Sequence, residues 1–228
     1  MKSSKQGQQP NSIGSFLGEI YSNHNSQQRG RGFVIFGKER GGLFAQWLGQ
    51  GKKILDLGCR DCALTGYYAR DNEILGLDID QGGLDICREE LGIQTKLTDL
   101  NGDWDIPANS FDAVVAAELL EHLYHPEEVL RKISDVLKSG GMLVGSVPHA
   151  FSLINRLRIL SGRKEGTPLA DPTHINHFSY RELEKMLRNV FDIVEIRPFT
   201  RFKLLGRIFP RYFSFLLLFR CEKRTFGR

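Results

Sequence analysis

The chain has 228 residues, of which 41% are hydrophobic and 25% are charged, an ordinary balance for a soluble globular protein with one α/β domain. No apolar run is long enough to predict a membrane span, and residues 1–12 lack the apolar segment of a secretory signal. The net charge of +4 is unevenly placed, because residues 197–228 carry nine Lys or Arg side chains against one acid.

The four cysteines, Cys59, Cys62, Cys87 and Cys221, are too few and too unevenly spread to predict a disulfide framework. They favour a reducing, cytoplasmic setting. The basic C-terminal region could face a nucleic acid, an anionic lipid surface or an acidic substrate, and it could equally be a solvated edge of a sheet.

Residues 1–12 are expected to be a disordered lead-in, followed over residues 13–50 by a helical region that is broken around Gly30–Gly32. From Lys52 onward, short apolar runs alternate with helical patterns, which is typical of a mostly parallel sheet with crossover helices. The expected strands are Lys53–Asp56, Glu73–Leu77, Thr95–Thr98, Phe111–Ala116, Met142–Ser146, Phe191–Ile196 and Phe215–Cys221.

Expected helices between these strands are Gly83–Leu91, His125–Leu137 and Tyr180–Val190. Ser179, three residues before Glu182, predicts a capping box at the start of the last of them. Residues 148–178 lack a strand pattern and predict a lid-like insertion that covers a substrate. We expect residues 13–228 to form a single domain.

A strand, a tight turn and a helix are predicted from Lys53 onward, and in doubly wound sheets a ligand binds where such a turn follows a strand. Asp78 closes the next strand about 20 residues later, the position of a carboxylate that accepts hydrogen bonds from ribose hydroxyls. After the third strand, Asp99 and Leu100 could hold an adenine ring. A nucleoside site is therefore expected at this edge of the sheet.

The turn itself, Gly58-Cys59-Arg60-Asp61-Cys62, contains a single glycine. A dinucleotide site needs several glycines so that the backbone can approach a pyrophosphate. The sequence therefore argues against phosphate binding and favours S-adenosylmethionine, which has no phosphate.

Four segments, in this order, resemble the motifs of class I methyltransferases of the small-molecule branch, including those of the ubiquinone pathway. They are Asp56-Leu57-Gly58-Cys59, Asp78, Phe111–Val115 with Glu118–Leu123, and Val136–Val144. The resemblance implies a Rossmann-like, seven-stranded, mostly parallel sheet with an antiparallel last strand and helices on both faces. It implies S-adenosylmethionine as cofactor, bound by Asp56, Gly58, Cys59, Arg60, Asp78, Ile79, Asp99, Leu100 and Glu118.

Two positions depart from this pattern, because the family usually has glycine where Arg60 stands and often where Cys62 stands. Two other interpretations of the same region stay open. The chain could keep the fold as a non-catalytic, Rossmann-like binding protein. Cys59 and Cys62 could also form a redox or zinc pair.

Methyl transfer from a sulfonium is an in-line displacement, so it depends mainly on positioning, with a base where the acceptor must lose a proton. His149 and His174 are the predicted catalytic residues, because they flank the insertion above the fourth and fifth strands. A structural, hydrogen-bonding role is the alternative for each of them.

Glu118, Glu121 and His122 share the spacing of a metal-binding pattern found in small-RNA terminal 2′-O-methyltransferases and in ubiquinone-pathway O-methyltransferases. In those families a later histidine completes the site, and here it would be His174 or His177. Such a site would suit Mg²⁺. Because the same pattern also occurs in relatives without a metal, metal binding is left open.

The expected acceptor is a small or lipid-linked molecule, methylated at oxygen. Arg156, Arg158, Arg163 and Lys164 in the insertion could grip an anionic group on it. The basic C-terminal region could touch a membrane surface. An RNA 2′-O-methyltransferase is the alternative enzyme, although the body of the chain is not basic enough to favour a nucleic acid as partner. No stable protein partner is implied.

Overall fold

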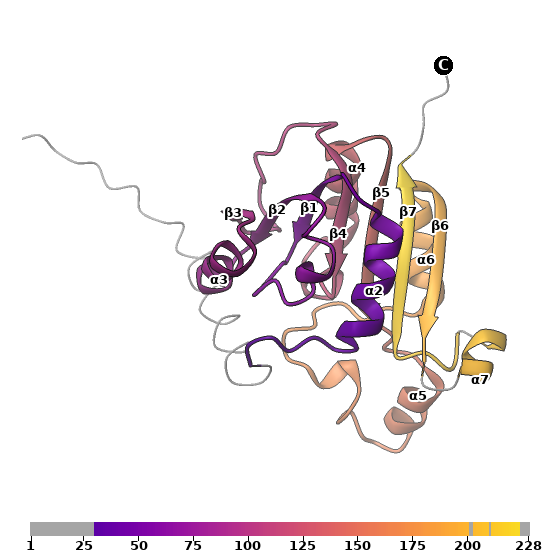
Figure 1. Cartoon of the computed structure of the whole chain (residues 1–228). Helices are drawn as coiled ribbons and strands as arrows, with labels where there is room; N and C mark the ends of the chain where they lie inside the picture. The colour runs from indigo at the N-terminus through magenta and orange to yellow at the C-terminus, as the bar shows by residue number, and fades with distance from the viewer. Residues whose placement is uncertain (1–29, 201–202, 210, 224–228) are drawn as a thin grey trace, which may run out of the picture.

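The computed structural model describes residues 30–200, 203–209 and 211–223. The expected lead-in, residues 1–12, and residues 13–29 of the first helical region lie outside the described residues. The structure has one seven-stranded sheet with the strand order β3-β2-β1-β4-β5-β7-β6 (Figure 1). All seven expected strands are present, with ends that differ by a few residues. The predicted Rossmann-like fold is confirmed.

The strands, in chain order, are β1 (Lys53–Leu57), β2 (Glu73–Asp78), β3 (Gln94–Leu97), β4 (Phe111–Ala117), β5 (Leu137–Pro148), β6 (Phe191–Phe199) and β7 (Leu216–Lys223). The α-helices are α2 (Gly37–Leu48), α3 (Gln81–Leu91), α4 (Pro126–Val136), α5 (Leu153–Leu160), α6 (Tyr180–Arg188) and α7 (Lys203–Ile208). Single 3₁₀ turns are η2 (Thr65–Tyr67), η3 (Leu120–His122) and η4 (Pro168–Ala170).

The pairing of the strands is parallel from β3 to β5, and β7 runs antiparallel to both of its neighbours, β5 and β6. The predicted antiparallel last strand is therefore confirmed. In a parallel sheet the carboxyl ends of the strands lie along one edge. The segments that follow β1, β2, β4 and β5 consequently meet at that edge.

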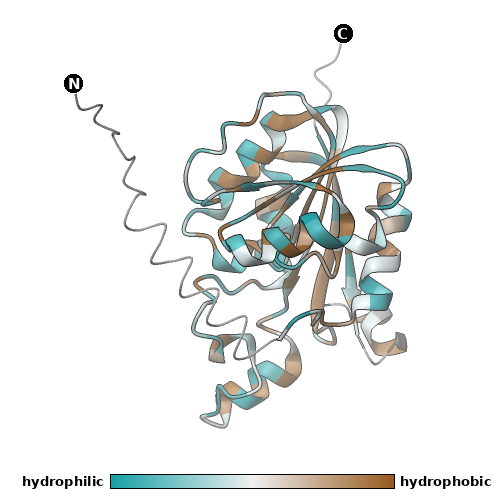
Figure 2. Cartoon of the chain, turned by 60° about the vertical axis from the view of Figure 1, so that its left-hand side comes forward, coloured by the Kyte–Doolittle hydropathy of each residue, from teal (hydrophilic) through white to brown (hydrophobic). Residues whose placement is uncertain are grey.

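Helices cover both faces of the sheet, because successive strand residues point to opposite sides. Leu55 packs with α4 and α6 in one core cluster, whereas Ile54 packs with α2 and α3 in the other. In Figure 2 the strands at the centre are largely hydrophobic, and the surrounding helices mix hydrophobic and polar residues. This layered burial is the usual way in which such a sheet excludes water.

Helix boundaries differ from expectation in two places. After β1 the chain makes only η2, where a full helix was expected, and α4 ends at Val136, so that β5 begins at Leu137. A register shift between Phe111 and Ala113 lets this longer β5 pair with β4. The capping box at Ser179 and Glu182 is present as predicted.

The insertion between β5 and α6 contains α5 and η4 and lies beyond the carboxyl ends of the parallel strands (Figure 1). A bridge between His149 and Phe178 closes it at its base. Among the helices within the described residues, none has the length and apolar character needed to cross a membrane.

Candidate active site

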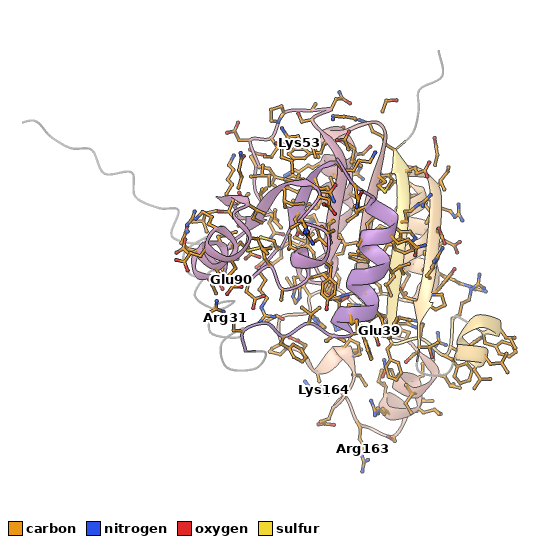
Figure 3. The ribbon with its side chains drawn as sticks, viewed as in Figure 1. Arg31, Glu39, Lys53, Glu90, Arg163 and Lys164 are labelled. Carbon is orange, nitrogen blue, oxygen red and sulfur yellow. A yellow bond between two sulfur atoms is a disulfide. The ribbon has the colours of Figure 1, made fainter. Side chains whose placement is uncertain are left out.

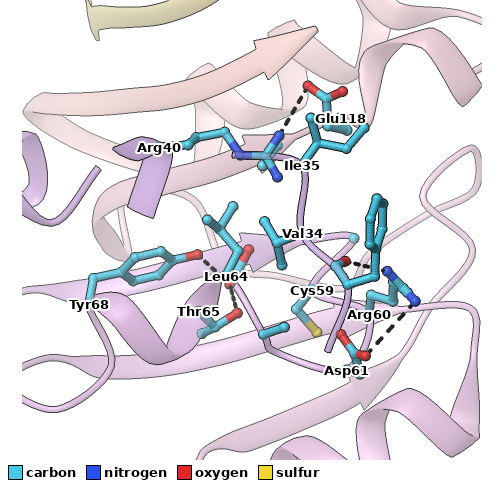
Figure 4. Close-up of a pocket in the computed structure, with 15 residues that line it drawn as sticks. Val34, Ile35, Arg40, Cys59, Arg60, Asp61, Leu64, Thr65, Tyr68 and Glu118 are labelled. Carbon is cyan, nitrogen blue, oxygen red and sulfur yellow. Dashed lines mark hydrogen bonds and ion pairs between the residues drawn. The ribbon is translucent and has the colours of Figure 1, made fainter. Parts of the chain in front are cut away.

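A cavity lies beyond the ends of β1 and β4 (Figure 4). Five predicted cofactor residues line it, and they are Asp56, Gly58, Cys59, Arg60 and Glu118. The segment before α2 covers one side of the cavity with Phe33, Val34 and Ile35. The Arg60 guanidinium holds that segment by donating hydrogen bonds to the carbonyl oxygens of Gly30 and, at 2.9 Å, Phe33.

The turn after β1 has the backbone of a glycine-rich loop although it contains one glycine. Gly58, Arg60 and Cys62 all have positive φ angles, of 70°, 53° and 56°. This conformation costs a residue with a side chain about 1–2 kcal/mol. Arg60 and Cys62 therefore hold a conformation that glycine adopts more easily, at an energetic cost that the surrounding contacts must offset.

Asp78 connects this turn to the end of β2. Its carboxylate accepts hydrogen bonds from the backbone N–H of Arg60 at 2.8 Å and of Asp80 at 2.9 Å. Burial raises the pKa of this carboxyl. Each carboxylate oxygen can accept more than one hydrogen bond, so Asp78 keeps acceptor capacity for a ligand.

Asp56 lies at the floor of the cavity and is 3% exposed. Its carboxylate accepts hydrogen bonds from the hydroxyls of Thr65 at 2.6 Å and Tyr68 at 2.7 Å. Burial raises its pKa to about 6 despite these two hydrogen bonds. The carboxyl therefore changes charge close to neutral pH.

Replacing Asp56 with asparagine is expected to remove a pH dependence of stability. The folded protein holds the Asp56 proton more tightly than the unfolded chain, with a pKa of about 6 against 3.8. This stabilising contribution is complete below about pH 4 and is lost as the pH rises through 6, a loss of about 3 kcal/mol by linkage. Urea unfolding of both proteins across this range measures it. A difference in unfolding free energy that is independent of pH would contradict it.

Arg40, on α2, points into the cavity toward Glu118 (Figure 4). It is 5% exposed, and its Nη1 lies 3.4 Å from the Glu118 carboxylate and 3.3 Å from the Ser146 hydroxyl. Ser146 in turn donates a hydrogen bond to Glu118 at 2.8 Å. Within the part of the chain that the structure describes, the buried Arg40 Nε has no hydrogen-bond acceptor.

The remaining predicted cofactor residues lie outside this cavity. Ile79 follows Asp78, and Leu100 is buried. The Asp99 carboxylate accepts a hydrogen bond from the Asn101 N–H at 2.9 Å. β3 lies beside β2, and the Thr98 N–H donates to the Asp78 carbonyl. Asp99 and Leu100 therefore lie next to Asp78 at the same edge of the sheet.

His149, a predicted catalytic residue, lies outside the cavity and is 1% exposed. Its Nδ1 is 2.7 Å from the Ser214 hydroxyl, and burial lowers its pKa to about 4. Its carbonyl accepts a hydrogen bond from the Asn155 side chain. A buried, weakly basic imidazole with these partners fits the structural alternative, because a general base works best with a pKa near neutral.

His174 lies in a cluster with Glu121 and His122, whose ligand atoms are all within 4.8 Å of one another. The cluster forms because the Ile175 and Asn176 N–H groups donate to the Glu121 carbonyl, which docks the end of the insertion onto η3. The His122 and His174 rings are 4.9 Å apart. His177 is adjacent, 6.5 Å from His174 between ring centroids.

This cluster has the chemistry of a metal site. His122 Nδ1 lies 2.9 Å from the Thr173 carbonyl and His174 Nδ1 lies 2.9 Å from the Pro168 carbonyl. A carbonyl only accepts, so each Nδ1 carries the proton and each Nε2 is the nitrogen that could bind a metal. One carboxylate and two imidazoles suit a divalent transition metal better than the Mg²⁺ that would suit the sequence pattern. Glu118, the first residue of the metal-binding pattern, lies outside this cluster and pairs with Arg40.

Sequence reasoning missed Arg40. The signal for it was present, because Arg40 shares the buried face of α2 with Phe44, Trp47 and Leu48. An arginine at a helix position that otherwise takes apolar residues needs a buried partner or a ligand. Reading α2 as an amphipathic helix would have placed it facing the sheet.

The sheet order, the turn after β1 and the carboxylate at the end of β2 together define the class I, S-adenosylmethionine-dependent methyltransferases. Residues 55–145 match the family described as "Methyltransferase domain". The fold is therefore that of a class I methyltransferase, and the matched segment contains the turn after β1 and Asp78.

The chain is 32% identical over 112 residues to a ubiquinone biosynthesis O-methyltransferase from Azoarcus sp. and spans about half of that relative, since the match covers 46% of each chain. Among solved structures, a SAM-dependent methyltransferase from Archaeoglobus fulgidus is 18% identical with a TM-score of 0.68, over 89% of this chain and 99% of that one.

A second solved structure is the 1,6-didemethyltoxoflavin-N1-methyltransferase from Burkholderia thailandensis, with bound 1,6-didemethyltoxoflavin and S-adenosylhomocysteine. It is 13% identical to this chain, with a TM-score of 0.68, over 98% of this chain and 94% of that one. At these sequence identities, the similarity to the two solved structures shows the fold alone.

Proposed function

We propose that the chain transfers the methyl group of S-adenosylmethionine to an oxygen atom of a small or lipid-linked acceptor. The observation that carries this proposal is the adjacency of two sites. Glu118 lines the cavity, and Glu121, three residues further along the chain, belongs to the cluster with His122 and His174. One site can hold the methyl donor, and the other can hold and deprotonate a hydroxyl.

In this proposal the cofactor lies along the edge of the sheet. Asp78 accepts hydrogen bonds from the ribose hydroxyls, while Asp99 and Leu100 hold the adenine. Arg40 binds the carboxylate of the methionine part through its buried Nε, because a guanidinium recognises carboxylates well. The methionine part then lies over Asp56 and the turn at Gly58.

The acceptor lies beneath the lid, residues 148–178. Its oxygen attacks the methyl carbon in line with the carbon–sulfur bond, which breaks. The proton of the acceptor hydroxyl passes to His174 in the metal-free site, and to the neighbouring His177 where His174 holds a metal. A metal ion held by Glu121, His122 and His174 would lower the pKa of a bound hydroxyl and orient it. Most of the rate enhancement comes from holding the two reactants at attack distance.

The test is methyl transfer from a cofactor with an isotope-labelled methyl group into cell extracts, resolved by mass spectrometry into aqueous, lipid and RNA fractions. We expect label in a small molecule or a lipid, on oxygen. Label in RNA would favour the 2′-O-methyltransferase instead. Titration calorimetry with S-adenosylmethionine is run first, since an absence of binding heat would favour a non-catalytic binding protein.

Metal involvement is tested in the same assay with a chelator and with Glu121→Gln. We expect both to lower the rate if a metal orients the acceptor, with the chelator having no further effect on the variant. Addition of Zn²⁺ or Mn²⁺ should raise the melting temperature of the wild type and not of Glu121→Gln, because a metal stabilises the folded state that binds it. Equal shifts in both proteins would contradict the site.

We also propose that the chain acts in the cytoplasm and touches an anionic lipid surface. The contact surface, here called the α5–α7 patch, exposes Ile154, Leu157, Leu160, Leu204 and Ile208 by 46–83%. Both helices lie beyond the carboxyl-end edge of the sheet (Figure 1), and the Leu153 N–H at the start of α5 donates to the carbonyl of Tyr212, which follows α7.

Basic residues are frequent in the two segments that carry the α5–α7 patch. Residues 151–167 carry four bases and one acid, and residues 203–215 carry three bases and no acid. Arg163 and Lys164 extend outward at this end of the molecule (Figure 3). Exposed apolar side chains on segments rich in bases complement an anionic membrane. The place of α5 within the lid would give access to a lipid-linked acceptor.

The double variant Leu157→Glu, Leu160→Glu is expected to lower binding to phosphatidylglycerol-containing vesicles by about tenfold or more, since two leucines no longer enter the lipid. Co-sedimentation measures the bound fraction. Leu97→Glu, at the far edge of the sheet and 54% exposed, is the matched control and should bind as the wild type does. Equal binding by the double variant would contradict the contact.

A further inference from the structure

Three cysteines meet behind the cofactor turn, and two of them form a disulfide. Cys62 in the turn is bonded to Cys87 of α3, with their Cα atoms 5.4 Å apart. No disulfide was predicted from the spacing of the cysteines, and the structure forms this one. The crossover from β1 through β2 to α3 brings together two residues that are 25 positions apart. Cys59 lies in the same group, with the three sulfur atoms within 4.8 Å of one another.

The disulfide joins the two halves of the cofactor site. One half is the turn with the positive φ angles of Arg60 and Cys62, and the other is α3, which begins three residues after Asp78. α3 approaches the turn so closely that a Cβ on Gly83 would lie 2.6 Å from the Arg60 carbonyl oxygen. Because the turn is held in a costly conformation, its geometry depends on such tertiary contacts.

The oxidation state of the disulfide also affects residues that line the cavity. Arg60 and Cys59 line the cavity, while the Arg60 N–H positions the Asp78 carboxylate. Release of Cys62 from Cys87 removes the covalent link that keeps the turn against α3. The N–H of Arg60 and the carboxylate of Asp78 then lose part of their preorganisation for a ligand.

We propose that Cys62 and Cys87 form a reversible thiol–disulfide site that sets the affinity of the domain for its cofactor. A dithiol reductant donates two electrons and two protons. The sulfur–sulfur bond breaks, two thiols form in the protein, and the reductant becomes a cyclic disulfide. The oxidised domain binds S-adenosylmethionine tightly, and the reduced domain binds it weakly. This inference rests on the proposed cofactor site.

Cys59 does not exchange with the disulfide in the resting state. Its thiol is 7% exposed, and burial raises its pKa well above the usual range, so the attacking thiolate is scarce. Cys62 and Cys87 are 3% and 0% exposed, so a reductant reaches them only when the turn opens. An isolated disulfide in a cytoplasmic protein is typically of this transient, redox-sensing kind.

The experiment measures S-adenosylmethionine binding by calorimetry on oxidised protein and on protein reduced with dithiothreitol, with free thiols counted by alkylation and mass spectrometry. Reduction should raise the number of alkylated cysteines from two to four. We expect it to weaken binding by about tenfold and to lower the melting temperature by about 8 °C. Equal affinity in both states would overturn the proposal.

Three variants test whether the response to dithiothreitol depends on the Cys62–Cys87 disulfide. Cys62→Gly suits the positive φ and should fold, bind with the reduced protein's affinity, and no longer respond to dithiothreitol. Cys87→Ser should behave in the same way. Cys221→Ala, which removes a buried free thiol of β7 outside this group, should keep the full redox response. A dithiothreitol response that persists in Cys62→Gly would overturn the proposal, and oxidised protein without any cofactor binding would instead overturn the cofactor site.

Discussion

Replacing Asp78 with alanine is expected to lower the affinity for S-adenosylmethionine by about 100-fold or more, the largest effect of any single change in the cavity region. A carboxylate that accepts two ribose hydroxyls makes two charge-assisted hydrogen bonds, each worth about 1.5–3 kcal/mol. The change also leaves the Arg60 and Asp80 N–H groups without their acceptor. Titration calorimetry of the two proteins gives the difference in affinity directly.

Asp80→Ala is the matched control for this experiment. Asp80 is two residues away and caps α3 by accepting a hydrogen bond from the Gly82 N–H. Its loss should cost about 1 kcal/mol of stability and leave the affinity nearly unchanged. Circular dichroism of both variants checks that they fold. If Asp78→Ala folds and binds as tightly as the wild type, the ribose site has been placed at the wrong carboxylate.

Replacing Arg40 with methionine should lower cofactor affinity by about 10- to 100-fold, the value of one charge-assisted hydrogen-bonded pair. Methionine fills much of the same volume without the charge. The variant also leaves the Glu118 carboxylate, whose side chain is 14% exposed, without its cationic partner. Part of the loss therefore comes from Glu118, and the double variant Arg40→Met, Glu118→Gln separates the two contributions.

Lys38→Met is the control for Arg40, because Lys38 lies on the exposed side of the same helix. It removes the same charge from α2 and should leave the affinity as it is. Calorimetry at low and high salt adds a second readout, since a buried pair is screened far less than an exposed one. Equal effects of the two substitutions would show that Arg40 acts through long-range charge and not as a carboxylate anchor.

Much of the fold follows from local patterns. The apolar run at Ile54–Leu57 and its counterparts predict buried strands, and their alternation with helical segments predicts parallel pairing. The largest difference between the predicted and the observed elements is the helix expected after β1, where the chain forms only η2. There Gly41 of α2 lies so close to Tyr67 that a Cβ would meet the ring at 2.3 Å, so α2 occupies the space along this segment. Such packing is a tertiary effect that no local pattern contains.

Residues of the candidate site that lie at the end of a strand could be predicted from the sequence. Contacts between segments that are distant in the sequence could not. Asp78 and Gly58 follow from the strand pattern alone. The Cys62–Cys87 disulfide and the Arg40–Glu118 pair depend on which helix lies against which turn. His149 shows the same limit, because its position after β5 predicted a catalytic role, whereas its contact with Ser214, 65 residues away, is visible only in the structure.

The placement of β7 between β5 and β6 has a consequence for synthesis on the ribosome. β6 is made before β7, yet it has no partner in the sheet until β7 inserts between it and β5. During that interval the edge of β5 presents unpaired backbone groups beside buried side chains such as Leu143 and Val144, which invites association with other nascent chains. A chain that stops before Leu216 would keep this open edge permanently, so we expect it to aggregate rather than to fold with reduced activity.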